Sequence, residues 1–327
     1  LEQGATVPFI ARYRKEVTGS LNEVQIAAVR DLLQRLKELD KRREVIIQSI
    51  NEQGKLTPAL EAQLRAAESV TVLEDLYMPY KPRRRTRATI ARERGLEPLA
   101  DLLLKQQAYD LTALAKPYVS SEKDVADVEA ALAGARDIIA ERVSENATSR
   151  ERVRQLYRRS AQLSSHVVKG KEEEAFKFKS GFDWKENAMR APSHRVLAVL
   201  RGEEAGMLRV HVTPDNDEPC LEILLKQYVR GSGPTSKQVE EAVHDGYKRL
   251  LAPSIETEMR NLLKERADRE AIRVFAENLR QLLLSPPLGQ KRVMGIDPGF
   301  RTGCKVVCLD AQGNLLHYEA IYPNPPQ

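Results

Sequence analysis

Asp297 is the residue of this chain whose type and position are best suited to chemistry. Residues 293–296 are predicted to form a short buried strand that ends at Asp297. Pro298 and Gly299 then turn the chain, and a second strand is expected over residues 303–309. A carboxylate at the open end of a sheet can bind Mg²⁺, because hard divalent ions prefer oxygen ligands. The same position equally suits a turn residue whose side chain bonds to the backbone two residues on.

A cluster of cations between residues 81 and 94 is the second feature with clear chemistry. Its seven cations, against the single anion Glu93, are Lys81, Arg83, Arg84, Arg85, Arg87, Arg92 and Arg94. Pro79 and Pro82 are expected to end the preceding helix and to keep the chain extended. Each guanidinium group offers a bidentate fork that suits phosphate. The cluster can therefore bind a nucleic-acid backbone or an acidic protein surface, or it can be a solvated basic loop.

Residues 6–19 form a smaller candidate for phosphate contact. This segment has an apolar side with Phe9, Ile10 and Tyr13 and a basic side with Arg12, Arg14 and Lys15. Arg12 and Lys15 can touch phosphate from a short helix or turn. A solvated cationic side is the alternative, because Lys and Arg stems often cover apolar surface while their charges stay in water.

Length and composition limit the class of protein. The 327 residues are about twice a typical domain length, so two or three units are expected. The net charge is only +5, and affinity for nucleic acid must therefore come from local clusters. The sequence has no apolar run of about 18 residues and no recognisable secretory segment, which predicts a soluble cytoplasmic protein that binds no membrane. The cysteines form no CxxC pair and are expected to be small packing residues: Cys220, Cys304 and Cys308.

Amphipathic periodicity predicts a helical region over residues 1–184. One helix is expected to start at a capping box that begins at Ser20 and to stop at Gly54, and Thr57 is expected to cap the next. Later helices joined by polar turns are compatible with a helix-turn-helix module. A strongly periodic helix over residues 122–147 is followed by one that Ser149 is expected to cap. The outer face of that helix is expected to carry Arg150, Arg152, Arg154, Arg158 and Arg159.

The pattern then changes to strands and later returns to helices. A charged connection over residues 172–184 carries aromatic side chains that could stack on bases or anchor it in a core: Phe176, Phe178, Phe182 and Trp184. A small β-hairpin is predicted from strands at residues 195–200 and 207–212. Further on, a helix is expected to break at Pro253, to restart at Ser254 and to run to about Leu284.

These patterns predict a mainly α protein that is α+β overall. Three domains are expected. Residues 1–184 form a helical N-terminal region that contains the helix-turn-helix-like module, and residues 185–287 contain the β-hairpin and further helices, including the long helix. Residues 288–327 are the start of a further domain. Because a third strand is expected over residues 315–322 after a turn at 310–314, the last domain should begin with a three-stranded antiparallel sheet.

Several stretches resemble the Tex family of bacterial transcription accessory factors. In chain order they are GATVPFIARYRKEVTG, LEDLYMPYKPRRRTRATIARERGLEPLA, SHRVLAVLRGEEAGMLRV, RLLAPSIETEMRNLL, KRVMGIDPGFRTGCKVVCLD and IYPNPP. The resemblance implies the N-terminal portion of a mostly helical protein, in which a helix-turn-helix region precedes a YqgF-type domain of RNase H-like fold. In the family, helix-hairpin-helix elements and an OB-fold RNA-binding domain follow, and the sequence is expected to stop before them.

The resemblance also bears on Asp297. In nucleases of the RNase H-like fold, the first-strand Asp is one of several carboxylates that hold two Mg²⁺ ions, and Asp297 matches that position. The other carboxylates would lie beyond Gln327, and Asp310 and Glu319 are not placed to replace them. We therefore expect no cofactor and no catalysis here. A metal-dependent nuclease or junction resolvase, using Asp297 and Mg²⁺ in the full-length protein, is the alternative.

The resemblance and the cationic cluster together predict a non-catalytic transcription accessory factor that binds RNA or DNA. Sequence-independent contact with the phosphate backbone is expected. The candidate residues are Arg83, Arg84, Arg85 and Arg87, then Lys81, Arg12 and Lys15. A scaffold that binds RNA polymerase or other transcription machinery is a third hypothesis, and no small-molecule substrate is expected.

Overall fold

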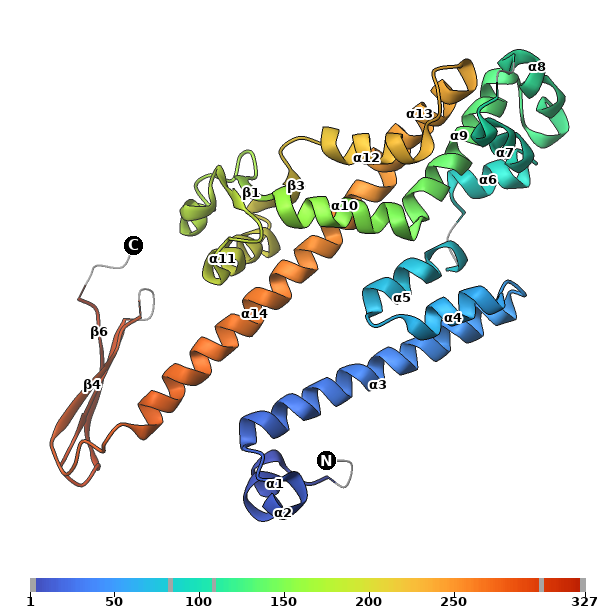
Figure 1. Ribbon diagram of the computed structural model, residues 1–327. Helices are drawn as coiled ribbons and strands as arrows, with labels where there is room; N and C mark the ends of the chain where they lie inside the picture. Colours follow the sequence, from blue (N-terminus) through green and yellow to red (C-terminus); the bar gives the residue numbers. More distant parts are fainter. Residues whose placement is uncertain (1–3, 82–84, 108–109, 300–302, 324–327) are drawn as a thin grey trace. The chain divides into compact units, whose positions relative to one another are not determined.

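The computed structural model describes residues 4–81, 85–107, 110–299 and 303–323 (Figure 1). Contacts divide the chain into two units, Leu1–Ala267 and Asp268–Gln327. Helices dominate the first unit, which also holds a small sheet, and the second unit carries another small sheet. The mainly α, α+β fold class is therefore confirmed. The helix-turn-helix module and the domain boundaries at residues 184 and 287 stay predictions.

The first unit begins with a run of helices around a small apolar core. They are α1 (Val7–Tyr13), α2 (Lys15–Thr18), α3 (Glu23–Glu52), α4 (Pro58–Ala66), α5 (Val70–Tyr77) and the 3₁₀ turn η1 (Met78–Tyr80). The core joins the second half of α3 to α4 and α5, and Ile50, Leu64 and Leu73 are fully buried in it. Thr57 caps α4 as predicted, since its hydroxyl accepts a hydrogen bond from the Leu60 amide at 3.2 Å.

The capping residue of α3 differs from the prediction. Asn22 caps the helix instead of Ser20, because its side chain accepts a hydrogen bond from the Gln25 amide at 2.9 Å. The Gln25 side chain in turn accepts from the Asn22 amide at 3.0 Å. Ser20 lies in the left-handed region with a φ of 67°, directly after Gly19 with a φ of 64°. The capping box therefore exists but begins two residues later than predicted.

A second, larger core fills the rest of the first unit. Its helices include α6 (Arg87–Glu93), α7 (Glu97–Lys105), α8 (Leu111–Ala115), α9 (Val128–Glu145), α10 (Ala147–Ser160), α12 (Glu218–Tyr228) and α13 (Pro234–Asp245), with 3₁₀ turns η2 (Lys116–Tyr118) and η3 (Ser121–Lys123). Helix α9 contacts α6, α7, α10 and α13. Its contact face combines small and branched residues, among them Ala135, Ile138 and Ile139, which are fully buried.

The predicted cap of α10 is wrong by three residues. Asn146 ends α9 and also caps α10, since its side chain accepts a hydrogen bond from the Ser149 amide at 3.0 Å. Ser149 is buried inside α10, where its hydroxyl lies 2.8 Å from the hydroxyl of Tyr228. The expected helix over residues 122–147 begins only at Val128, with Asp127 as its cap.

The sheet of the first unit has the antiparallel order β2-β1-β3. Its strands are β1 (Ala161–Val167), β2 (Trp184–Asn187) and β3 (Leu208–Pro214), and the turn η4 (Phe176–Gly181) lies between β1 and β2. The predicted hairpin is wrong in one of its strands, because residues 195–200 lie in helix α11 (Ser193–Glu204). Val196 and Val199 are buried at helical spacing there. The second predicted strand is confirmed as β3, but it pairs with β1.

The predicted helix break at Pro253 is also wrong. Helix α13 continues through a π-helical segment, η5 (Gly246–Leu251), directly into α14 (Ala252–Leu284). The Ala252 amide donates to the carbonyl of Tyr247, five residues back, which is the wider turn of a π-helix. Pro253, which has no amide hydrogen to donate, follows this turn directly. The end at Leu284 is as predicted. No helix in the described part of the chain is both long enough and apolar enough to cross a membrane.

The second unit contains the end of α14 and the antiparallel sheet β4-β5-β6. Its strands are β4 (Val293–Asp297), β5 (Cys304–Leu309) and β6 (Leu315–Ile321), which confirms the predicted three-stranded sheet. The Asp310 carboxylate shapes the turn between β5 and β6, since it accepts hydrogen bonds from the Gln312 and Asn314 amides. The expected burial of β4 is wrong, because Met294 and Ile296 are exposed.

Candidate nucleic-acid interface

The predicted cationic cluster extends across the start of helix α6. Arg83 and Arg84 lie outside the described residues. Lys81 has the extended backbone that was expected beside the prolines. Thr86 caps α6, because its hydroxyl accepts a hydrogen bond from the Thr89 amide at 3.0 Å. Lys81 and Arg85 therefore precede the helix, whereas Arg87 and the later cations belong to it or follow it.

The later cations of the cluster face carboxylates from other parts of the larger core. Arg92 Nη1 donates to Glu141 Oε2 at 2.6 Å, and Glu141 is buried on α9. The Thr86 hydroxyl donates to the other oxygen of Glu141 at 3.0 Å. Arg94 forms an ion pair with Asp124, near the start of α9. These contacts attach α6 to its neighbours and occupy the guanidinium groups.

Arg87 lies at a polar hollow of about 230 Å³ between α6, α9 and η5. The hollow is also lined by Asp137, Glu141 and Arg249. Burial raises the pKa of Asp137, and the opposing effects of the Arg249 and Arg87 charges do not offset it. Arg249 Nη2 donates to Asp137 Oδ1 at 3.0 Å. Arg87 thus lies near carboxylates at this hollow, but the residue itself is exposed.

Lys81 and Arg85 are more exposed than Arg92 and Arg94. Lys81 Nζ lies 3.9 Å from Glu74 Oε2, and its side chain is 49% exposed. Arg85 Nη2 donates to Glu93 Oε2 at 2.6 Å, with the Arg85 side chain 67% exposed and that of Glu93 50% exposed. Exposed ion pairs of this kind contribute little to stability. A phosphate group can therefore replace either carboxylate at small cost.

The N-terminal candidates lie on α1 and α2. Arg12 Nη2 is 3.3 Å from Glu23 Oε1, and both side chains are largely exposed. Lys15 is exposed, and among the described residues its amino group has no acidic partner within 4.0 Å. Both side chains remain accessible to a phosphate or to an acidic protein surface.

Two of the arginines predicted for the outer face of α10 are buried, and that part of the prediction is wrong. Arg150 and Arg154 are each 3% exposed. Both donate to the buried Asp75 on α5, from Arg150 Nε at 2.6 Å and from Arg154 Nη2 at 2.8 Å. They share the i, i+3, i+4, i+7 face of α10 with Val153 and Tyr157, and this spacing was the signal in the sequence that could have indicated burial.

The aromatic side chains between β1 and β2 mostly anchor their connection. Phe178, Phe182 and Trp184 pack against the larger core. Phe176 is 68% exposed, and Lys179 Nζ lies 5.5 Å from its ring centroid. The alternative of anchoring is thus confirmed for three of the four, and Phe176 alone of them is largely exposed.

Asp297 lies at the end of β4 and is exposed. Its register partner in β5 is Lys305. Within the described residues, no three His, Cys, Asp or Glu side chains gather closely enough to hold a metal ion. The metal-binding role of Asp297 and the absence of catalysis both stay predictions.

Comparison with known proteins identifies the parts of the chain. A model of the Tex-like protein N-terminal domain matches residues 1–51, the Tex central region-like model matches residues 106–275, and the Tex protein YqgF-like domain matches residues 291–327. The YqgF-like match contains the sheet that carries Asp297.

Relatives match along nearly the whole chain. Protein tex of Bordetella pertussis is 44% identical over 100% of this chain, and Transcriptional accessory protein Tex of Neisseria gonorrhoeae is 43% identical over 98%. The human S1 RNA-binding domain-containing protein 1 is 29% identical over 97%. The alignments cover 43%, 43% and 33% of these relatives, so the chain spans less than half of their length. Because the central-region model alone matches more than half of the chain, the chain belongs to the Tex family.

Proposed function

We propose that this chain contributes sequence-independent binding of a nucleic-acid backbone to a transcription accessory protein, without catalysis. Lys81 and Arg85 hold exposed cationic groups on either side of residues 82–84, where the sequence places Arg83 and Arg84. The contrast in exposure carries the proposal, because the Lys81 and Arg85 side chains are 49% and 67% exposed and those of Arg92 and Arg94 only 34% and 33%. It favours the exposed cations Lys81, Arg85 and Arg87 over Arg92 and Arg94 as phosphate-binding groups.

The family gives the proposal its context. One relative is named a transcriptional accessory protein and another an S1 RNA-binding domain-containing protein. Guanidinium and ammonium groups that contact phosphate release counterions, and the affinity then falls as salt rises. Such contacts position a protein on RNA or DNA without reading its sequence. RNA is the favoured ligand in this proposal because the name of the human relative refers to RNA binding.

The test is the salt dependence of binding by a charge-neutralised double variant, Lys81→Gln with Arg85→Gln. Fluorescence anisotropy with a single-stranded RNA gives the slope of log affinity against log salt. Each lost phosphate contact lowers the steepness of that slope by about 0.7, so the double variant should lose about 1.4. Lys226→Gln is the matched control, since Lys226 is an exposed cation paired with Glu222 at 3.0 Å on α12. An unchanged slope in the double variant refutes the assignment.

Two further measurements separate this proposal from the other hypotheses. If the cluster binds an acidic protein surface instead, polyglutamate will bind the chain, and RNA will not displace the polyglutamate. If the full-length protein is a nuclease, it will cleave RNA or DNA with Mg²⁺, and Asp297→Asn will abolish cleavage. We expect no cleavage over a panel of substrates. Cleavage that depends on Asp297 would refute the non-catalytic proposal and support the nuclease hypothesis.

A further inference from the structure

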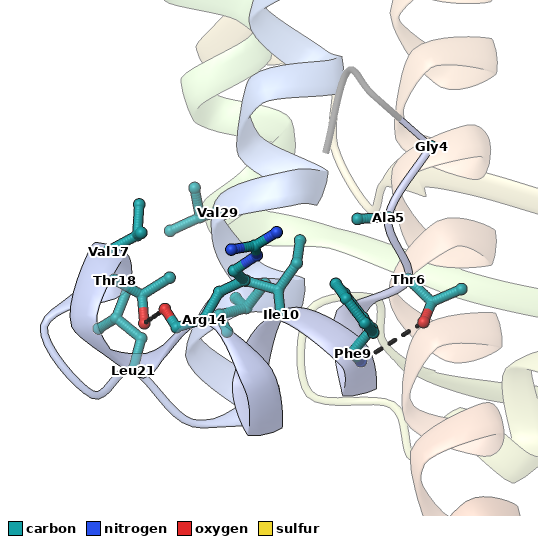
Figure 2. A pocket seen from close by; sticks show the side chains of 11 residues that line it. Gly4, Ala5, Thr6, Phe9, Ile10, Arg14, Val17, Thr18, Leu21 and Val29 are labelled. Atoms are coloured by element: carbon teal, nitrogen blue, oxygen red, sulfur yellow. Dashed lines mark hydrogen bonds between the residues drawn. The ribbon is translucent and has the colours of Figure 1, made fainter.

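The strongest feature outside the cationic cluster is an apolar groove at the N-terminal helices. It has a volume of about 810 Å³ and lies between the residues before α1, the helices α1 and α2, and the first turns of α3 (Figure 2). Its lining is mainly apolar and includes Phe9, Ile10, Val17, Leu21 and Val29. Several of these side chains are well exposed, with Val17 at 77% and Val29 at 51%.

The sharp turn between α2 and α3 leaves this groove open. Gly19 and Ser20 both have positive φ values, so the chain reverses within a few residues. Helix α1 packs on α3 through Ala11 and Ile26, which are buried. Helix α2 has no buried residue and leaves its Val17 on the surface.

The groove continues along an exposed apolar stripe of α3. Val29, Leu32, Leu33 and Leu36 have the i, i+3, i+4, i+7 spacing of one helix face and are 38% to 51% exposed. Farther along α3, Leu39, Ile46, Ile47 and Ile50 are buried in the small core with α4 and α5. Seven residues of helix add about 10 Å to the length of the groove. Groove and stripe together have the dimensions that an amphipathic helix of a few turns would fill.

Cations outnumber carboxylates around this apolar surface. Residues 4–37 contain six cations and three carboxylates. Glu23 pairs with Arg12 and Asp31 with Arg30. The Arg14 guanidinium lies at the groove itself (Figure 2). Among the described residues, neither Arg14 nor Lys15 has a carboxylate within 4.0 Å.

We propose that this groove binds an acidic amphipathic helix of a partner protein. Leucine-like side chains of the partner would enter between Phe9, Val17 and Val29 and then follow the stripe on α3. Glutamate or aspartate side chains at the edge of the partner helix would pair with Arg14 and Lys15. This surface is distinct from the cationic cluster before α6 and does not depend on the nucleic-acid proposal.

The probe is a synthetic helix of about four turns with Leu at i, i+3, i+4 and i+7 and Glu along both flanks. Its binding to the 327-residue chain is measured by fluorescence anisotropy, beside a peptide in which Lys replaces every Glu. We expect the Glu peptide to bind about tenfold more tightly. Arg14→Gln should reduce that preference, because it weakens the attraction of the Glu peptide and relieves the repulsion of the Lys peptide.

Serine variants of exposed valines test the location. Val17→Ser and Val29→Ser should each weaken binding of the Glu peptide about fivefold, because each removes apolar area from the interface. Val24→Ser is the matched control: Val24 is 77% exposed like Val17, but it does not line the groove. Circular dichroism checks that all three variants keep their helical content.

Three outcomes would overturn the proposal. Equal binding of the Glu and Lys peptides would remove its charge argument. Self-association of the chain that disappears in Val17→Ser would assign the groove to a second copy. The third outcome is that RNA displaces the Glu peptide from the wild-type chain, while Arg14→Gln abolishes both this displacement and RNA binding. That result would assign the groove to nucleic acid.

Discussion

Asp75 is the centre of a buried ion-pair network, and its replacement by alanine should destabilise the protein by about 3 to 5 kcal/mol. Asp75 is 6% exposed, and its carboxylate accepts hydrogen bonds from Arg150 and Arg154 of α10. Both arginines also bond to Glu258 on α14. Burial lowers the pKa of Arg154, but its bonds to Glu258 and Asp75 outweigh burial and raise the pKa overall, so the guanidinium stays charged.

Two routes give the same magnitude for Asp75→Ala. The variant loses two hydrogen bonds between charged groups, each contributing about 1.5 to 3 kcal/mol. It also leaves Arg150 and Arg154, both nearly without solvent, sharing the carboxylate of Glu258, and only Arg154 has a second carboxylate partner, Glu151. Removing one partner of a buried pair costs about 3 to 5 kcal/mol, mostly because the remaining charge is buried without compensation.

The effect should begin in a defined part of the structure. Asp75 belongs to α5 and to the small core of α3, α4 and α5, whereas Arg150, Arg154 and Glu258 belong to helices of the larger core. The network is therefore a polar attachment between two apolar cores. In Asp75→Ala, amide hydrogen exchange should speed up in α5 more than in α9.

Urea unfolding followed by circular dichroism measures the loss of stability. Asp75→Asn should be milder than Asp75→Ala, because the amide keeps an acceptor for one arginine. Glu61→Ala is the control, since Glu61 pairs with Arg65 at 2.8 Å on the exposed side of α4 and its loss should leave the midpoint unchanged. A loss below about 1 kcal/mol for Asp75→Ala, or equal acceleration of exchange in α5 and α9, would refute the reasoning.

Two further outcomes follow from buried positions in the larger core. Gly246→Ala should destabilise by about 1 to 3 kcal/mol in urea unfolding, because a Cβ there would lie 2.7 Å from the Ala140 carbonyl oxygen and force η5 away from α9. Burial raises the pKa of the Cys220 thiol, so less thiolate is present at any pH below that pKa. With Ellman's reagent at mildly alkaline pH, the half-buried Cys304 and Cys308 should react in the native protein, and Cys220 only after denaturation. Rapid reaction of all three native thiols would contradict this.

Much of the fold was predictable because its signals are local. The cap at Thr57, the end of α14 at Leu284 and the turn at Asp310 each depend on residues within one turn of chain. Residues 195–200 were mistaken for a strand because a short apolar run fits both a buried strand and a helix. Tertiary packing favours the helix, because Leu208 of β3 fills the space that a Cβ at Gly202 would occupy.

The buried arginines of α10 show a different limit of sequence reasoning. Arg150 and Arg154 have the spacing of a buried face, but burying a charge is costly unless a partner compensates it. Their partners are Asp75, on α5, and Glu258, on α14. Nothing near α10 in the sequence identifies either carboxylate, so the charge of the arginines favoured the solvated interpretation despite their spacing.

Local signals in the cationic cluster predicted its cations, but only tertiary contacts near the start of α6 show which of them have partners in the fold. Thr86 begins a helix whose buried residues, Ala88 and Ala91, pack on α9 and bring Arg92 to Glu141. Arg92 and Arg94 therefore hold α6 to its neighbours, whereas Lys81, Arg85 and Arg87 remain at the surface. Neutralising all seven together would mix loss of folding with loss of binding, because removing Arg92 leaves the Glu141 carboxylate buried with weaker compensation. Variants confined to the exposed cations, Lys81, Arg85 and Arg87, test whether this surface binds phosphate and leave Glu141 with its partner.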